Sequence, residues 1–261
     1  MSADLTAIVT THNRPDGCLR AVRSVLDQDP APREVVVCDD GSTDDTPRLL
    51  AELAASDDRV RVHRFDPGRG GPGPGRNAGI RMARTEWVAF LDDDDAWLPG
   101  KVAAQRAWFD DPSVDVIGTN ALRSDGAAYF PPGGAPRRPQ RDDVLAANPL
   151  IVSSVAVRRR AMAAIGGFDE RPWMGGIADY DAWLRLADAG CGFLVLPEPL
   201  IAYDDAGSER YSASRRRMQR ALIRHGWRRW AGRPLSGADL LAAVRRTTDY
   251  GLIALEDVRR R

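Results

Sequence analysis

Short apolar runs alternate with amphipathic segments along the first ninety residues of the chain. Three runs, at residues 5–10, 34–38 and 87–91, have the length and the β-branched or aromatic content of buried strands, and residues 60–65 alternate between apolar and polar positions as a fourth strand. Segments with helical periodicity or helix-start signals lie between them, at residues 20–26, 43–55 and 77–83. This β-α-β-α alternation predicts a parallel sheet with helices on both faces.

The pattern is less regular after residue 100. It predicts helices at residues 99–109 and 178–189 and short strands at residues 114–119, 152–157, 193–196 and 200–203. Two segments rich in glycine and proline, residues 67–75 and 124–140, are typical of loops. From about residue 214 the chain is rich in arginine and has helical periodicity, so we expect a helical extension packed on the domain.

Composition sets the broad class of the protein. The 261 residues, 43% of them apolar, suit one large domain or one domain with a small appendage. Lys+Arg and Asp+Glu number 37 each, and this zero net charge does not support broad binding to nucleic acid or to an anionic membrane. Nearly all the positive charge is arginine, and Lys101 is the only lysine.

The cysteines and the N-terminus predict a cytoplasmic protein. The three cysteines are scattered and show neither a disulfide framework nor a metal-binding spacing, which indicates a reducing compartment. The first residues lack a basic region followed by an apolar stretch, and no run approaches the roughly 18 apolar residues that span a bilayer. We therefore expect no signal peptide and no transmembrane segment, and a peripheral position at the inner membrane face stays open.

Four consecutive aspartates, Asp92–Asp95, directly follow the apolar run at residues 87–91. Open α/β sheets place their ligands at the carboxyl ends of strands, where these aspartates fall. Carboxylate oxygens suit Mg²⁺ or Mn²⁺, which commonly share their coordination sphere with the phosphates of a substrate. The alternative is a charged turn that caps the next helix, because aspartate is a good N-cap residue.

Polar groups also follow the first two predicted strands, at residues 10–14 and 39–42. Taken alone, Asp39-Asp40-Gly41-Ser42 is more typical of a turn than of a site. Parallel strands align their carboxyl ends, so these two groups and Asp92–Asp95 can line one crevice. The coincidence of all three on one sheet edge favours a ligand-binding site over three unrelated turns.

Six stretches within residues 5–203 form an ordered set: Ile8–Pro15, Val37–Asp44, Gly75–Ile80, Trp87–Asp95, Gly166–Glu170 and Ala178–Leu186. In the order and spacing of these stretches the chain resembles family 2 glycosyltransferases with the GT-A fold. Each stretch alone is a weak signal, whereas the ordered set is specific. The resemblance implies a mostly parallel open sheet flanked by helices. It divides residues 1–213 into a nucleotide-sugar-binding half, 1–100, and an acceptor half, 101–213, with the helical extension at 214–261.

The resemblance assigns the donor to the first half of the domain. Thr10 and Asp40 match contacts to the nucleotide base, with Asp40 accepting the N3–H of uracil or thymine. Asp39 lies next to that contact, and Arg76 is a partner for the base or the phosphates. In the acidic run Asp92 matches the ribose-side member of the DxD motif.

The remaining aspartates of the run have separate implied roles. Asp94 matches the ligand of the Mn²⁺ or Mg²⁺ ion that bridges the donor's diphosphate. Asp93 belongs to the same nucleotide-sugar-binding stretch. Asp93 and Asp95 are expected to hold the turn or to contact the residues that support the ligand-binding groups. A divalent cation at this place would stabilise the negative charge that builds on the departing diphosphate.

The resemblance assigns the acceptor to the second half. Asp179 matches the catalytic base that takes the proton of the acceptor hydroxyl, although from position alone it could simply cap a helix. Asp181 and Trp183 match the acceptor-side helix start, and Trp173 is a candidate for stacking on the acceptor. Attack from the face opposite the leaving group inverts the anomeric centre, so no nucleophile from the enzyme is required.

The implied activity is therefore inverting transfer from a UDP- or dTDP-sugar to a hydroxyl group. The alternatives are a nucleotidyltransferase, which would carry a glycine-rich basic loop after the first strand, and a non-catalytic nucleotide-sugar or glycan-binding module. The acceptor stays open among a glycan, a lipid-linked sugar, a small metabolite and a peptide, and so does the formation of homo-oligomers. Many family members carry a histidine after the last core strand that can complete the metal site or contact phosphate, and this chain has none there. The alternatives are that Asp204 or Asp205 takes its place, that Arg210 does so from further on, or that waters fill the coordination sphere.

Overall fold

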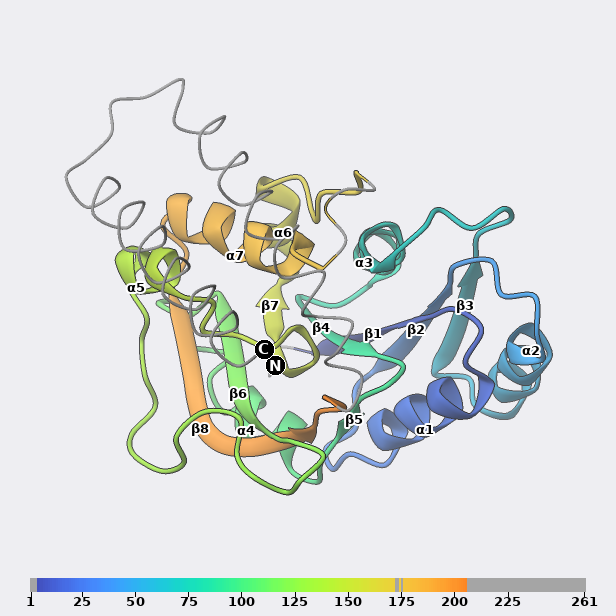
Figure 1. Ribbon diagram of the computed structural model, residues 1–261, viewed down its shortest axis with the longest axis horizontal. Helices are drawn as coiled ribbons and strands as arrows, with labels where there is room; N and C mark the ends of the chain where they lie inside the picture. The colour runs from blue at the N-terminus through green and yellow to red at the C-terminus, as the bar shows by residue number, and fades with distance from the viewer. Residues whose placement is uncertain (1–3, 172–173, 175, 206–261) are drawn as a thin grey trace, which may run out of the picture.

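A mixed eight-stranded sheet forms the centre of the computed structural model, which describes residues 4–171, 174 and 176–205. The strands lie in the order β3-β2-β1-β4-β7-β6-β8-β5 (Figure 1). Their bounds are β1 Leu5–Thr11, β2 Glu34–Asp39, β3 Val60–Arg64, β4 Trp87–Asp92, β5 Ala96–Trp97, β6 Val116–Leu122, β7 Ala156–Arg158 and β8 Phe193–Ala202. The predicted α/β class with an open sheet flanked by helices is confirmed.

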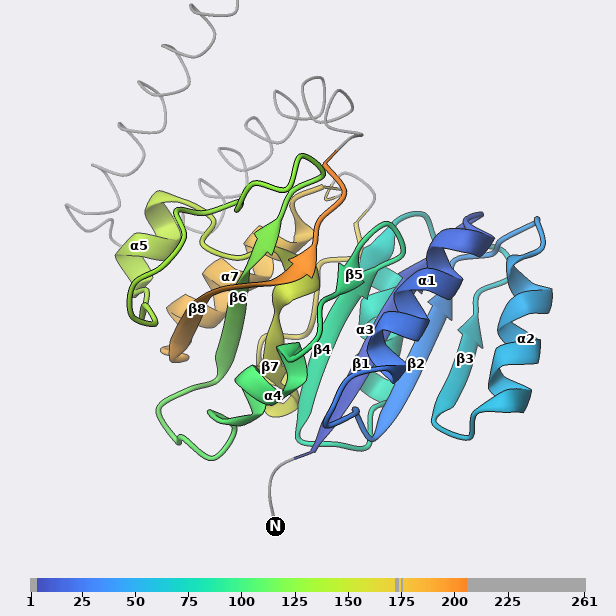
Figure 2. The same cartoon turned by 90° about the horizontal axis from the view of Figure 1, so that it is seen from below.

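Helices cover both faces of this sheet, as Figure 2 shows. Their bounds are α1 Pro15–Leu26, α2 Thr46–Ser56, α3 Pro72–Met82, α4 Lys101–Arg106, α5 Arg141–Ala146, α6 Arg159–Ala164 and α7 Ala178–Asp188, with a 3₁₀ turn, η1, at Val152–Ser154. Helices α1 and α4 lie on one face, whereas α3, α6 and α7 lie on the other. None of the described helices is long and apolar enough to cross a membrane.

The first four strands are parallel, and their alternating side chains feed two separate cores. Strand β1 pairs with β2 on one side and with β4 on the other, in parallel. Ala7 and Val9 of β1 belong to the core under α1, whereas Ile8 belongs to the core under α3 and α7. Because both faces of β1 are covered, all seven of its residues are buried, as is usual for parallel strands in the middle of a sheet.

Helix α3 begins at Pro72, inside the glycine- and proline-rich segment that we expected to be a loop. Proline is favoured in the first helical turn, so this residue starts the helix instead of preventing it. The glycines that follow allow a close approach to β1. A Cβ atom on Gly79 would lie 2.4 Å from Cγ2 of Ile8, and one on Gly75 would lie 3.0 Å from Cγ2 of Thr10. Helix α3 therefore lies against the strand that carries the polar end group.

The second half differs from the sequence expectation in several elements. Residues 152–157 form η1 and then the short strand β7, not one strand. The two strands expected at 193–196 and 200–203 are one strand, β8, which ends at Ala202 and continues past Pro197 and Pro199 with two register shifts against β6. The helix expected at 99–109 is regular only over α4, and β5, α5 and α6 were not anticipated. The expected extension at 214–261 lies outside the described residues.

Candidate active site

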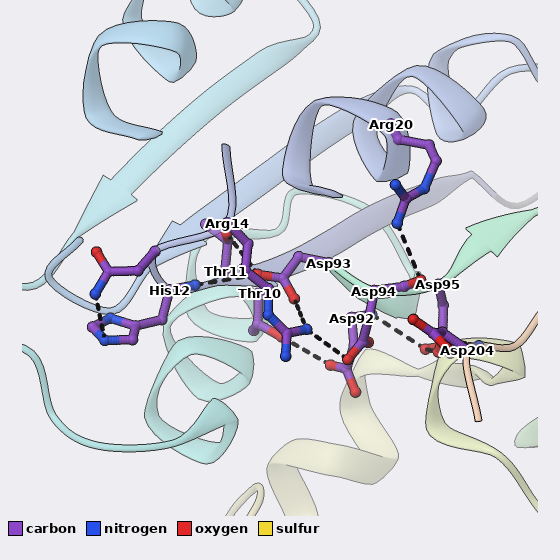
Figure 3. Close-up of polar contacts among 12 residues, drawn as sticks. Thr10, Thr11, His12, Arg14, Arg20, Asp92, Asp93, Asp94, Asp95 and Asp204 are labelled. Carbon is purple, nitrogen blue, oxygen red and sulfur yellow. Dashed lines mark hydrogen bonds and ion pairs between the residues drawn. The ribbon is translucent and has the colours of Figure 1, made fainter. Parts of the chain in front are cut away.

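The carboxyl ends of β1, β2 and β4 meet at one edge of the sheet. The register pairs Thr10 with Cys38 on one side and with Asp92 on the other, and it pairs Thr11 with Asp39. The loops after these three strands therefore lie together, as the sequence predicted. Figure 3 shows the side chains at the ends of β1 and β4 pointing toward one another.

Asp92 is held by the strand beside it and by α3. It accepts a hydrogen bond of 2.9 Å from the Thr10 hydroxyl, and Arg76 donates to both of its oxygens at 2.6 and 2.8 Å. The Arg76 side chain is 5% exposed and its guanidinium carbon lies 5.4 Å from the centre of the Phe168 ring. The Asp92 N–H donates to Ser153 Oγ at 3.2 Å. These contacts fix the position of this carboxylate before any ligand binds.

Asp93 faces the loop after β1. It accepts hydrogen bonds from the Thr11 hydroxyl at 2.8 Å, from the His12 N–H at 3.3 Å and from Arg14 at 3.0 Å. Burial raises the pKa of Asp93, although the hydroxyl of Thr11 and the charge of Arg14 oppose that rise. The carboxylate thus holds the loop after β1 against the acidic turn, and a nucleotide contact from it stays a prediction.

Asp94 and Asp95 have opposite surroundings. The Asp94 side chain is 40% exposed and pairs with Arg14 at 2.6 Å, and its carbonyl accepts from Arg20 at 3.3 Å. Asp95 is only 2% exposed and accepts hydrogen bonds from the Ser153 hydroxyl and from the Asp204 N–H, the latter at 2.9 Å. Burial raises the pKa of Asp95 to about 8. Asp94 is thus the more accessible of these two carboxylates.

The two aspartates after β2 organise the neighbouring loops. Asp39 is fully buried, and one of its oxygens accepts from both the N–H and the hydroxyl of Ser42, at 2.9 and 2.5 Å. Asp40 is partly exposed, and its carboxylate accepts three backbone N–H groups, at 2.5, 2.9 and 3.1 Å, from residues 69–71. Asp40 therefore anchors the glycine-rich loop that leads into α3.

Asp179 lies in the first turn of α7 and is partly exposed. Burial raises its pKa; the positive charge of Arg76 opposes that rise and the negative charge of Asp92 adds to it. The predicted base therefore lies within the electrostatic reach of the Asp92–Arg76 pair. The sequence predicted Asp179 and Asp92 separately, and the structure brings them to the same site although 87 positions separate them in the chain.

Asn77 fastens the loop that precedes α7 to α3. Its amide nitrogen donates to the Phe168 carbonyl and to Glu170, both at 2.8 Å, and its amide oxygen accepts the Phe168 N–H at 2.8 Å. Both partners belong to the Gly-Gly-Phe-Asp-Glu stretch that supports the resemblance. The sequence indicates Asn77 only as part of a motif, whereas the structure shows that its side chain links the two halves of the domain.

The other acceptor-side candidates do not line the open edge. Asp181 is fully buried and accepts from Arg185, one turn later in α7, at 2.7 Å. Trp183 is also fully buried, with its ring centre 6.0 Å from that of Phe168. Neither side chain presents a surface to an acceptor in this structure. Trp173 lies outside the described residues.

The segment after β8 approaches the acidic turn through its backbone. The Asp204 N–H binds Asp95, whereas Asp205 pairs with Arg123 at 2.7 Å and accepts the Ser124 N–H at 3.1 Å. Asp205 is thus committed to the loop after β6, whereas the backbone of Asp204 lies at the acidic turn; which residue replaces the family's histidine stays a prediction. Arg210, the third candidate, lies outside the described residues.

The donor set at the acidic turn fits a cation that also binds a substrate. Among the described residues, no three histidine, cysteine, aspartate or glutamate side chains are grouped so as to hold a metal ion. Asp94 nevertheless offers a partly exposed carboxylate with hard oxygen donors. Mg²⁺ is commonly held by one or two carboxylates together with substrate phosphates, and such an ion requires no cage made only of protein ligands.

Three residues that matter to this geometry received no role from the sequence. Arg14 belongs to the stretch after β1 but carried no assignment, and the single guanidinium bridges Asp93 and Asp94. Ser153 lies in a segment expected to be a strand and carried no signal at all. Arg20 was considered only as part of a helix.

Comparisons with known proteins agree with this architecture. The model of the family described as "Glycosyl transferase family 2" matches residues 6–162. The succinoglycan biosynthesis protein ExoO of Rhizobium meliloti is 46% identical over 99 residues, which are 38% of this chain and 28% of that protein. The GalNAc(5)-diNAcBac-PP-undecaprenol beta-1,3-glucosyltransferase of Campylobacter jejuni is 33% identical over 122 residues, 47% of this chain and 40% of that protein. The alignments thus span less than half the length of these curated relatives.

Solved structures support the fold. Residues 1–349 of S. aureus TarS match with a TM-score of 0.72 at 19% identity, over 95% of this chain and 72% of that one. The mannosyltransferase PcManGT of Pyrobaculum calidifontis matches with a TM-score of 0.67 at 20% identity, over 99% of this chain and 80% of that one. The family model covers more than half of the chain, and the structural matches agree with it over nearly the whole length. The chain therefore belongs to glycosyl transferase family 2 and has the GT-A fold.

Proposed function

We propose that this glycosyltransferase moves a sugar from a UDP- or dTDP-sugar to an acceptor hydroxyl with inversion at the anomeric carbon. A divalent cation, Mn²⁺ or Mg²⁺, binds the donor's diphosphate, and Asp179 is the general base. The observation that carries the proposal is the convergence of Asp179 with the Asp92–Arg76 pair at the strand edge. One carboxylate base on the acceptor side and one divalent cation on the donor side would suffice for inverting transfer.

The nucleotide lies across the ends of β1 and β2 in this proposal. A carboxylate has about four acceptor positions, and the backbone N–H groups of residues 69–71 use three on Asp40. One position is left to accept the N3–H of uracil or thymine. Thr10 and Asp39 border the base. A solved TarS structure contains UDP-GlcNAc, which supports a uridine donor, whereas PcManGT was solved with GDP-mannose and Mn²⁺.

Asp92 and Arg76 serve the ribose and the phosphates. Their mutual hydrogen bonds hold the carboxylate and the guanidinium in place, and Thr10 fixes the carboxylate from the other side. Such preorganised groups lose little freedom when the donor binds. The Nε atom of Arg76 is buried and has no hydrogen-bond partner among the described residues, so the exposed edge of the Asp92 carboxylate is the part of this pair that a ligand can reach.

Asp94 is the protein ligand of the divalent cation. When bound, the cation supplies electrostatic stabilisation to the departing nucleoside diphosphate. Asp94 suits this part because it is the more exposed member of the turn, and Asp93 and Asp95 already satisfy other groups. The PcManGT structure with Mn²⁺ supports a divalent ion in this fold.

Asp179 takes the proton from the acceptor hydroxyl. The raised pKa of its carboxyl makes the carboxylate a stronger base than an exposed aspartate. Arg76 limits that rise, because a nearby positive charge favours the ionised form of a carboxyl group.

The acceptor is best sought among carbohydrates. Two similar proteins are named for succinoglycan biosynthesis and for a glucosyltransferase that acts on an undecaprenol-linked glycan. These names support a growing glycan or a lipid-linked sugar over a small metabolite or a peptide. We assign the transfer to the cytoplasm, with lipid-linked acceptors presented at the inner membrane face. Residues 1–213 would form the transferase domain and 214–261 an extension.

Calorimetry and product analysis test this proposal together. UDP and dTDP should bind more tightly in the presence of Mn²⁺ or Mg²⁺ than in its absence, and incubation with a UDP- or dTDP-sugar should release the nucleoside diphosphate. Nucleotide binding that does not depend on metal would contradict the donor assignment. Release of pyrophosphate would favour the nucleotidyltransferase instead, and metal-dependent binding without turnover over a broad acceptor panel would favour the binding module.

A further inference from the structure

Arg14 neutralises the accessible side of the acidic turn. One nitrogen of its guanidinium, Nη1, lies 3.0 Å from Asp93 Oδ1 and 2.6 Å from Asp94 Oδ2 (Figure 3). Asp92 has its own counter-ion in Arg76. Of the described residues, Arg14 is therefore the only arginine or lysine whose side chain forms an ion pair with Asp94. Any other cation that binds Asp94 has to compete with this guanidinium.

The loop after β1 places Arg14 firmly over the turn. Asn13 has a left-handed backbone, with φ of 51°, and its N–H donates to Ser42 Oγ at 2.8 Å. Its side-chain oxygen accepts the Thr43 N–H, also at 2.8 Å. Arg14 is the N-cap residue of α1 but makes no side-chain capping bond. The residue before Arg14 is thus held by the loop after β2, while the hydrogen bonds of the Arg14 side chain within the described part of the chain go only to the acidic turn.

The two ion pairs of the turn differ in how easily they can be exchanged. The side chains of Arg14 and Asp94 are 42% and 40% exposed, whereas those of Arg76 and Asp92 are 5% and 28% exposed. Exposed ion pairs contribute little free energy, so Arg14 can leave Asp94 at small cost. The contact to Asp93, whose side chain is 10% exposed, can keep the guanidinium at the site after it leaves Asp94.

We propose that Arg14 is the resident counter-ion of Asp94 in the donor-free enzyme and moves to the donor's diphosphate when a divalent cation takes over Asp94. This inference rests on the proposed function. Its chemical basis is that guanidinium binds phosphate oxygens with strong, charge-assisted hydrogen bonds. A diphosphate and a divalent cation arrive together, so each carboxylate and each phosphate gains a counter-ion in the exchange. Arg14 thereby disfavours metal binding before the donor arrives and favours the donor afterwards.

The test is calorimetric titration of the full chain with MnCl₂ and with UDP, for the wild type and for Arg14→Gln. In the absence of nucleotide, R14Q should bind Mn²⁺ about two- to fivefold more tightly, the range expected when an exposed ion pair no longer competes. With Mn²⁺ saturating, R14Q should bind UDP about tenfold more weakly, because a charged hydrogen bond to the diphosphate is missing. One substitution thus shifts two affinities in opposite directions.

Two further variants control for fold and for charge. Arg14→Lys keeps the positive charge and should keep the Mn²⁺ affinity of the wild type. Arg48→Gln removes an exposed arginine that pairs with Glu52 on α2, and it should change neither affinity. Unchanged or weaker Mn²⁺ binding by R14Q, or UDP binding equal to that of the wild type, would overturn the inference. If the wild type itself bound no UDP with Mn²⁺, the proposed function would fail first, and the two failures are distinguishable.

Discussion

Four residues of one type, adjacent in the chain, acquire four different environments in this protein. Asp92 is locked by Arg76 and Thr10, Asp93 holds the loop after β1, and Asp95 is buried against Ser153. Asp94 keeps a partly exposed carboxylate. The sequence indicated that the acidic run was a ligand site, and it separated the four members only through the family resemblance. The physical separation comes from groups far away in the chain, such as Ser153, which no local pattern reveals.

The pair Asp93→Ala and Asp94→Ala should separate stability from activity. Asp93→Ala leaves the Thr11 hydroxyl and the His12 N–H without their acceptor, so we expect a loss of about 1–3 kcal/mol in the free energy of unfolding. Asp94→Ala should leave that free energy nearly unchanged, because the lost Arg14 pair is exposed. The Asp94→Ala variant should nevertheless release nucleoside diphosphate about 10²-fold more slowly than the wild type, or slower still.

Urea unfolding and initial rates on the same preparations check this pair. Rates are compared under conditions where both variants are folded. Equal losses of activity in the two variants would mean that the roles within the acidic run have been divided wrongly.

At the scale of elements, Glu34 ties together the amino-terminal ends of the parallel strands. It accepts hydrogen bonds from the Thr6 hydroxyl of β1 at 2.8 Å, the Arg84 N–H before β4 at 2.7 Å and Arg61 of β3 at 3.0 Å. Burial by itself raises the pKa of Glu34, but these hydrogen bonds and the charge of Arg61 outweigh it, and the net pKa is lowered. The end of the sheet opposite the candidate site is thus held by one ionised carboxylate.

Glu34→Gln should destabilise the fold in a pH-dependent way. A carboxyl with a lowered folded-state pKa stabilises the protein above its unfolded pKa of about 4.3 and loses that effect as the pH falls through the folded value. We expect E34Q to cost about 1–3 kcal/mol near pH 7, with a smaller difference from the wild type below about pH 4. Urea unfolding across this pH range measures it. The matched variant Glu52→Gln, at an exposed pair on α2, should show little effect; a pH-independent loss in E34Q would contradict the assignment.

The elements that the sequence predicted well are those whose pattern is set locally. Strands β1, β2 and β4 are buried on both faces, and a continuous apolar run is sufficient to identify them. The sequence pattern predicts two strands in place of β8 because Pro197 and Pro199 interrupt the apolar positions. The pairing of β8 with β6 accommodates these prolines through register shifts. The sequence pattern predicts a shorter helix than α3 because glycine has a low helix propensity, whereas the glycines of α3 allow its close contact with β1. Tertiary packing decides both cases.

At the scale of the whole molecule, the candidate site depends on the joining of two halves. The parallel half supplies the ends of β1, β2 and β4, and the later half supplies Asp179, Ser153 and the Asp204 backbone. The only lysine of the chain, Lys101, lies between these two halves. Lys101 on α4 is fully buried and donates to Gln105 at 2.9 Å, and Gln105 donates to the carbonyls of Ile117 and Ser154.

Lys101 should therefore report on global opening of the fold. Its ammonium nitrogen lies 3.9 Å from the centre of the Trp97 ring, and burial lowers its pKa well below the ordinary value. We expect an amine-reactive ester to label Lys101 only after unfolding. Peptide mapping by mass spectrometry over a urea series should show Lys101 labelling that follows loss of structure. Labelling in the native state at the rate of a model amine would show that the junction opens without global unfolding.

We propose that Asp179 is the general base of the glycosyl transfer and that the donor binds across the carboxyl ends of β1, β2 and β4. The most direct measurement is the rate of nucleoside diphosphate release from UDP- and dTDP-sugars with Mn²⁺, together with calorimetric UDP affinity, for the wild type, Asp179→Asn and the control Asp188→Asn at the other end of α7. We expect D179N to release nucleoside diphosphate about 10²- to 10⁴-fold more slowly than the wild type, with a UDP affinity within about twofold of the wild-type value. D188N should match the wild type in both quantities. No release by the wild type, or a loss of UDP affinity in D179N as large as its loss of rate, would contradict this proposal.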